Sequence, residues 1–168
     1  VRSACSAGRL PDAMRTDSLR RIDSFPYRHR VAQLMSTPLV SALPEATVAE
    51  VSRLMSRRRI SSVVAVDHQG RPSGILTERD ILHIVATDSA LLSRPFGEVM
   101  SRPVHTVGSG ALAYRAIGRM SRHGVRHLAV VDDDGRAVGM LTAGALLKQR
   151  ATLALTLGDE IEHATETD

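Results

Sequence analysis

MSTPLVSALPEATVAEVSRLMSRRRISSVVAVDHQGRPSGILTERDIL, residues 35–82, occurs a second time in altered form. The second copy, MSRPVHTVGSGALAYRAIGRMSRHGVRHLAVVDDDGRAVGMLTAGALL, covers residues 100–147 and aligns without a gap at an offset of 65 residues. Fifteen of the forty-eight aligned positions are identical, among them the pair Gly74 and Gly139. Because turn glycines and apolar positions recur together, we predict one structural unit built twice.

Each copy predicts the element order β-α-β-β-α. Met-Ser-x-Pro opens an extended segment, because proline and the residue before it disfavour helix. In the first copy Thr47 is the expected N-cap of an amphipathic helix. The β-branched run 61–67, a turn at 68–71 and residues 72–76 predict two strands joined by a hairpin. A helix from residue 78 to about residue 86 closes the copy.

The second copy predicts strands over 125–131 and 137–141, and a helix from residue 143 to about residue 155. We therefore expect a mixed α/β (α+β) fold with one repeat over residues 31–90 and another over residues 91–150.

The flanks of the repeat pair carry weaker patterns. Residues 1–30 are polar and arginine-rich, which predicts a tail or a loosely docked helix. Residues 151–168 predict an amphipathic C-terminal helix or linker. Its apolar residues need a surface to cover, on the repeats or on another domain of a larger protein.

Composition limits the classes of function. The chain has 168 residues, 43% of them apolar, and its one cysteine, Cys5, excludes an internal disulfide. No apolar run approaches the roughly 18 residues of a membrane span, so we expect a cytoplasmic protein without a membrane partner. The net charge is +4, but aromatic residues are only 2% and the arginines are scattered, so nucleic-acid binding is not expected.

The run GILTERDIL, residues 74–82, permits two interpretations. Thr77 and Asp80 have the spacing of a capping box, which alone would explain them. Alternatively, the helix N-terminus attracts a phosphate, the Asp80 carboxylate accepts both hydroxyls of a ribose, and Gly74 lets a ligand approach the backbone. The second copy keeps the threonine as Thr142 but replaces the acid with Ala145, so it lacks whatever Asp80 does.

The sequence gives little support for a metal site or a catalytic site. His123 and His127 lie four residues apart but do not share a helix face, and no third zinc ligand is evident. The run 132–135, DDDG, lacks the alternation and the later glutamate of a calcium loop and predicts a hairpin turn. No Walker loop or nucleophile elbow is present, so we expect neither an enzyme nor a metal requirement.

One pattern is complete in both copies: Met-Ser-x-Pro, then a helix, then Val-x-Asp-x-x-Gly, then Gly-x-x-Thr. Over roughly residues 31–148, the chain therefore resembles a tandem pair of cystathionine β-synthase (CBS) domains, which is called a Bateman module. The resemblance implies two units packed about a pseudo-twofold axis, with two clefts between them. In that family the clefts bind AMP, ADP or ATP, and in some members S-adenosylmethionine, NAD-type molecules or cyclic dinucleotides. The family's ribose-binding signature, Gly-x-x-Thr-x-x-Asp, is complete in GILTERD.

By position, the resemblance assigns Asp80 to the ribose hydroxyls, Thr77 to the phosphate or ribose edge and Ile75 to the base. Gly74 and Thr142 belong to the two copies of the signature. Further contacts are implied at the helix-to-strand junctions and after each Met-Ser-x-Pro, at Ile60, Ser61, Val125, Arg126, His127, Pro38, Leu39, Pro103 and Val104. Because Ala145 lacks the acid, we expect at most one good nucleotide site per chain.

The function expected from these features is regulatory. The module would bind an adenine nucleotide and transmit its occupancy to an effector domain or partner, and such modules commonly form homodimers. Two alternatives stay open. In one, the pair serves only for dimerisation or protein interaction with no nucleotide bound. In the other, it is the sensor part of a larger signal-transduction protein with a nucleotidyltransferase-like domain.

Overall fold

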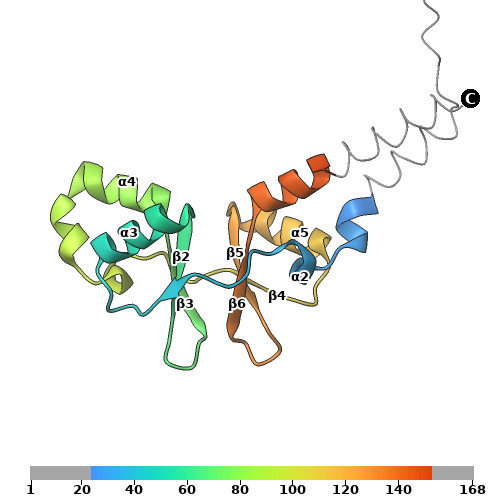
Figure 1. Cartoon of the computed structure of the whole chain (residues 1–168), viewed down its shortest axis with the longest axis horizontal. Helices are drawn as coiled ribbons and strands as arrows, with labels where there is room; N and C mark the ends of the chain where they lie inside the picture. The colour runs from blue at the N-terminus through green and yellow to red at the C-terminus, as the bar shows by residue number, and fades with distance from the viewer. Residues whose placement is uncertain (1–23, 153–168) are drawn as a thin grey trace, which may run out of the picture.

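The computed structural model describes residues 24–152, which fold into two similar units side by side (Figure 1). Each unit has the element order β-α-β-β-α and one three-stranded sheet, which confirms the predicted mixed α/β fold. The predictions for residues 1–23 and 153–168, including most of the N-terminal tail and the C-terminal segment, lie outside the described residues.

The first repeat builds its sheet around its second strand. This central strand pairs in parallel with a short first strand and in antiparallel fashion with the third strand. The elements are β1 (Ser41–Ala42), α3 (Val48–Arg58), β2 (Ser62–Val66), β3 (Pro72–Thr77) and α4 (Glu78–Thr87).

The second repeat has the same pairings. Its central strand starts at His127 rather than at the predicted residue 125, because the helix before it ends at Gly124 in the left-handed conformation, with φ 63°. The elements are β4 (Thr106–Gly108), α5 (Ala113–His123), β5 (His127–Val131), β6 (Ala137–Thr142) and a helix over 143–152.

Local sequence explains where α3 begins and ends. The side chain of Thr47 accepts a hydrogen bond from the Glu50 amide, as predicted for an N-cap, and the Glu50 carboxylate accepts one from the Thr47 amide at 2.8 Å. Val48, Val51 and Met55 form its buried stripe.

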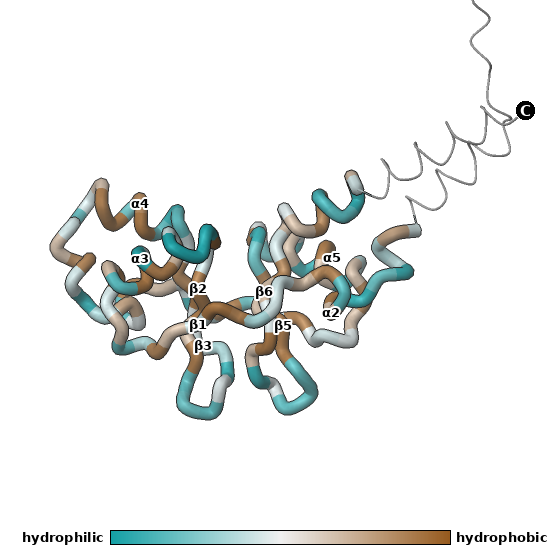
Figure 2. The backbone as a smooth tube through the Cα atoms, in the orientation of Figure 1, coloured by the Kyte–Doolittle hydropathy of each residue, from teal (hydrophilic) through white to brown (hydrophobic). Residues whose placement is uncertain are grey.

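Each core takes in residues that precede the sheet of the other repeat in the chain. Phe96 and Met100, on the segment that leads into the second sheet, are buried in the core of the first repeat. Phe25 and Val31, which precede the first sheet, are buried in the core of the second repeat. The short elements of these segments are α2 (Val31–Leu34) and the two 3-10 helices η1 (Ser89–Ser93) and η2 (Phe96–Glu98). In Figure 2 the central strands are brown and the two hairpin turns are teal.

This exchange is reciprocal, as a pseudo-twofold axis requires. Ser101 pairs with Ile75 of the first repeat, and Ser36 pairs with Met140 of the second. Since residue 36 is the counterpart of 101 and residue 140 the counterpart of 75, the two bridges are the same contact made twice. Within residues 24–152, no helix is both long and apolar enough to cross a bilayer.

Candidate functional site

A cleft of about 430 Å³ lies where the two repeats meet, within the volume range of small-molecule sites. Three segments and one serine form it: the β3–α4 junction, the residues after η2, and the α5–β5 junction. Its lining residues are Ser61, Ile75, Thr77, Glu78, Arg79, Asp80, Ser101, Arg102, Pro103, Val104, His105, Gly124, Val125, Arg126 and His127.

The Asp80 carboxylate both caps α4 and lines this first cleft. Its Oδ2 atom accepts hydrogen bonds from the amide and the hydroxyl of Thr77, each at 2.8 Å. Its Oδ1 atom has no protein partner within residues 24–152. A carboxylate can accept on both oxygens, so the cap leaves Asp80 able to accept ligand hydroxyls. The two interpretations of GILTERDIL are therefore compatible.

The N-terminus of α4 offers fewer free amides than the sequence predicts. The Glu78 amide donates to the Ser61 carbonyl at 3.1 Å, and the Asp80 amide donates to the Thr77 hydroxyl at 3.4 Å. An anion in the cleft would therefore depend mainly on cationic side chains.

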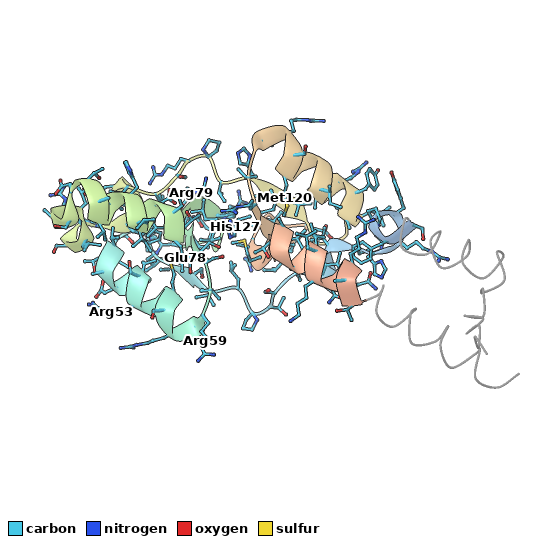
Figure 3. The ribbon with its side chains drawn as sticks, turned by 90° about the horizontal axis from the view of Figure 1, so that it is seen from above. Arg53, Arg59, Glu78, Arg79, Met120 and His127 are labelled. Atoms are coloured by element: carbon cyan, nitrogen blue, oxygen red, sulfur yellow. The ribbon has the colours of Figure 1, made fainter. Side chains whose placement is uncertain are left out.

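The opposite wall supplies the Arg126 guanidinium and the His127 imidazole from the α5–β5 junction. The His127 ring nitrogen Nε2 lies 3.0 Å from the Ser61 hydroxyl, which links the two repeats across the cleft. Burial lowers the pKa of His127, and the Arg126 guanidinium lowers it further, against the opposing effect of Glu78 and Asp80. His127 is therefore neutral near pH 7 in the free protein. Figure 3 shows His127 and Arg79 near the junction of the two repeats.

Sequence reasoning missed three further side chains of the first cleft, those of Arg79, Arg102 and His105. The His105 ring stacks on that of His123, with 4.2 Å between ring centroids. Burial lowers the pKa of His123, and His105 and nearby arginines add to this effect. Arg79 lies inside the Gly-x-x-Thr-x-x-Asp signature, and Arg102 and His105 flank the predicted site residues Pro103 and Val104. Their position next to predicted site residues was therefore the one signal in the sequence that could have identified them.

A second, smaller cleft of about 250 Å³ is the symmetry counterpart of the first. It contains no counterpart of the α4 residues Glu78, Arg79 and Asp80, since residues 143–145 do not line it. Its lining residues are Ser36, Pro38, Leu39, Val40, Arg59, Ile60, Ser61, Ser62, Met140 and Thr142.

The predicted site residues thus divide between the clefts. Nine of them line the first cleft: Ser61, Ile75, Thr77, Asp80, Pro103, Val104, Val125, Arg126 and His127. The others, apart from Gly74, line the second cleft together with Ser61, and these are Pro38, Leu39, Ile60 and Thr142.

Gly74 lines neither cleft. A Cβ atom added there would lie 2.4 Å from Sδ of Met100, so the missing side chain makes room for Met100 rather than for a ligand. The same contact recurs at Gly139, where a Cβ atom would lie 2.7 Å from Sδ of Met35. Both glycines therefore serve the packing between the repeats.

The described part of the chain, residues 24–152, contains no group of three side chains that could hold a metal ion. The polar groups of the first cleft are instead two carboxylates, hydroxyls and the guanidinium groups of three arginines. This set suits a ligand that carries both hydroxyls and negative charge.

Comparison with known proteins identifies the family to which this architecture belongs. The CBS domain family matches residues 31–87 and 96–151. A CBS domain protein from Pyrobaculum aerophilum, solved in complex with AMP, is 32% identical with a TM-score of 0.67, over 78% of this chain and 99% of that one. The CBS domain pair of protein MJ0100, solved with 5′-methylthioadenosine and S-adenosyl-L-methionine, is 25% identical with a TM-score of 0.66, over 72% and 98%.

Among curated proteins, the inosine-5′-monophosphate dehydrogenase of Mycobacterium leprae is 36% identical over 115 residues. The match covers 68% of this chain but only 21% of the dehydrogenase. With both repeats matched and the reciprocal packing observed, the chain belongs to the CBS domain family, as a tandem pair of CBS domains.

Proposed function

We propose that this CBS pair is a regulatory module that binds an adenosine-containing nucleotide of the AMP, ADP or ATP class in the first cleft. The observation that carries the proposal is the free Oδ1 atom of Asp80 in the lining of a cleft whose other wall bears Arg126 and His127. The group that can accept from ribose hydroxyls, Asp80, thus faces the groups that can bind phosphate, Arg126 and His127, across the first cleft.

The proposed contacts follow from the chemistry of each lining group. Asp80 accepts from the ribose hydroxyls, and Thr77 lies beside it at the ribose edge. The Arg126 guanidinium pairs with phosphate oxygens, for which its planar fork is suited.

The base is assigned to the apolar part of the lining, which comes from both repeats. Ile75 contributes from β3, and Pro103 and Val104 contribute from the segment before β4. Such a surface suits the flat apolar face of an adenine. Related CBS proteins solved with AMP, and with 5′-methylthioadenosine and S-adenosyl-L-methionine, support the choice of an adenosine-containing ligand.

Transmission of the signal is proposed to depend on the bridging position of the ligand. A nucleotide in the first cleft contacts β3 and α4 of one repeat and the α5–β5 junction of the other. It therefore favours the relative orientation of the repeats in which both sets of contacts are made, and shifts the population toward that orientation. A partner domain or a second copy of the chain that packs on both repeats would sense this shift.

The test is isothermal titration of AMP, ADP and ATP into the wild-type chain and into Asp80→Asn. Asparagine keeps one oxygen that can accept from Thr77, so α4 stays capped, but it loses the charged acceptor. We expect saturable binding of about one nucleotide per chain in the wild type and much weaker binding in the variant. Wild-type affinity in Asp80→Asn, or no binding to either protein, would contradict the proposal.

A further inference from the structure

The second cleft is rich in hydrogen-bond donors and has no carboxylate. Its lining contains three serines, Thr142 and Arg59, and neither aspartate nor glutamate. The first cleft, in contrast, contains both Glu78 and Asp80. An anion in the second cleft would meet donors on several sides without repulsion from an acidic lining residue.

The loss of the acid changes what the signature threonine can do. In the first repeat the Thr77 hydroxyl donates its proton to Asp80. In the second repeat the Thr142 hydroxyl accepts from the Ala145 amide at 3.0 Å, and its proton has no acceptor within residues 24–152. Because a hydroxyl can accept and donate at once, Thr142 still caps its helix while its proton is free for a ligand.

Arg59 occupies a backbone conformation that favours glycine. Its φ and ψ angles are 52° and 47°, and no other non-glycine residue between residues 24 and 152 has a positive φ. The counterpart residue, Gly124, adopts the same conformation without a side chain to clash. Because non-glycine residues adopt this conformation uncommonly and such outliers cluster at functional sites, the Arg59 side chain is a candidate for a role in binding.

The side chain of Arg59 makes no hydrogen bond or ion pair with any residue of the described range 24–152. It stands at the C-terminal end of α3, as Figure 3 shows, and is the one charged residue that lines the second cleft. A guanidinium without a protein partner at the edge of a donor-lined cleft is suited to bind an oxyanion.

We propose that the second cleft binds a small phosphate-bearing ligand rather than a nucleotide. Arg59 and the Thr142 hydroxyl hold the phosphate group, and the remainder of the ligand is short. The cleft volume of about 250 Å³ lies below the usual range for drug-sized ligands, and the position of the ribose acceptor is occupied by Ala145. This inference is independent of the nucleotide proposed for the first cleft.

Two variants separate binding from folding. Arg59→Gly removes the guanidinium and relaxes the backbone. Ala145→Asp supplies an acid that completes a capping box and accepts the proton of the Thr142 hydroxyl, as Asp80 does from Thr77. Neither change should lower the thermal midpoint, because each makes its repeat resemble the other repeat at that position. Arg126→Gln is the matched control, since it removes an arginine from the first cleft only.

Inorganic phosphate and glycerol 3-phosphate are the probes, each titrated at constant ionic strength while the amide signals of Ile60 and Thr142 are followed by nuclear magnetic resonance. We expect saturable shifts in the wild type and in Arg126→Gln, and at least tenfold weaker binding in Arg59→Gly and Ala145→Asp. Tighter binding of glycerol 3-phosphate would identify a phosphate monoester as the ligand, and equal affinities would identify the free anion.

Three results would overturn the proposal. One is the absence of saturable shifts at Thr142 with either probe. Another is wild-type affinity in Arg59→Gly and Ala145→Asp, provided that both variants show cooperative unfolding. The third is a saturable shift of Thr142 caused by adenosine, because a nucleoside without a phosphate would then occupy the second cleft.

Discussion

Replacement of Asp80 by alanine should affect stability and nucleotide binding through different contacts. For stability, the change removes the acceptor of two hydrogen bonds of 2.8 Å from Thr77. Loss of such a cap costs about 1 kcal/mol, which lowers the thermal midpoint of a chain of this size by roughly 2–4 °C. For binding, it removes charge-assisted hydrogen bonds to the ribose hydroxyls. Their loss is worth about 3 kcal/mol, or roughly a 150-fold increase in Kd.

The chain contains its own control for this experiment. Glu50 forms the same capping box with Thr47 at the start of α3, also with two hydrogen bonds of 2.8 Å, and it lines neither cleft. Glu50→Ala should therefore lower the thermal midpoint as Asp80→Ala does, but leave the affinity for nucleotide unchanged.

Thermal unfolding and isothermal titration of the two variants with AMP, ADP and ATP measure both effects. The reasoning is refuted if Asp80→Ala loses stability as Glu50→Ala does and still binds nucleotide with the wild-type Kd. In that case the acid is a helix cap and nothing more.

Two further predictions concern packing and pH. Gly74→Ala should destabilise the chain by about 1–3 kcal/mol, because the added methyl group overlaps the buried side chain of Met100. Gly118→Ala, with no neighbouring atom within 4 Å and a position inside α5, should instead stabilise it by about 0.5–1 kcal/mol, and urea unfolding measures both. The lowered pKa of His127 means that the unfolded chain binds more protons below pH about 6.5, so the free energy of unfolding should fall as the pH decreases through this value. In His127→Gln this part of the decrease should disappear from unfolding curves recorded across the range, and an unchanged slope would contradict the assignment.

Much of the fold could be predicted because its signals are local. The N-cap at Thr47, the turn glycines and the β-branched runs each determine the conformation of a few neighbouring residues. Repetition at a constant offset strengthened every assignment, since a turn in one copy predicted a turn in the other. The boundaries differ by only one or two residues where a cap, such as Gly124, sets the exact end.

The exchange of segments between the repeats was not predictable from periodicity. Phe96 and Met100 pack into the first core although they lie at the start of the second repeat, and this depends on tertiary contacts between distant residues. For the same reason Gly74 was interpreted as an approach to a ligand when its neighbour is Met100. The paired recurrence of a methionine and a glycine in both copies was a usable signal, but only a structure relates the two positions.

The site shows the same division between local and tertiary information. The Thr77–Asp80 pair was identified from spacing, because a capping box and a ribose acceptor both require that spacing. The side chains of Arg102 and His105 were missed, since they join the cleft only when the second repeat folds against β3. The left-handed backbone conformation of Arg59 could not be predicted either, because arginine is a common residue at helix C-termini and does not by itself indicate a positive φ.

The most direct test of the nucleotide proposal is a titration of the wild-type chain with AMP, followed by the chemical shifts of assigned backbone amides. We predict that the shifts concentrate on the β3–α4 junction around Thr77 and Asp80 and, across the cleft, on Val104 and Arg126, and that they saturate at about one AMP per chain. Shifts confined to other surfaces, or no saturable shift at these residues, would contradict the assignment of the first cleft as the nucleotide site.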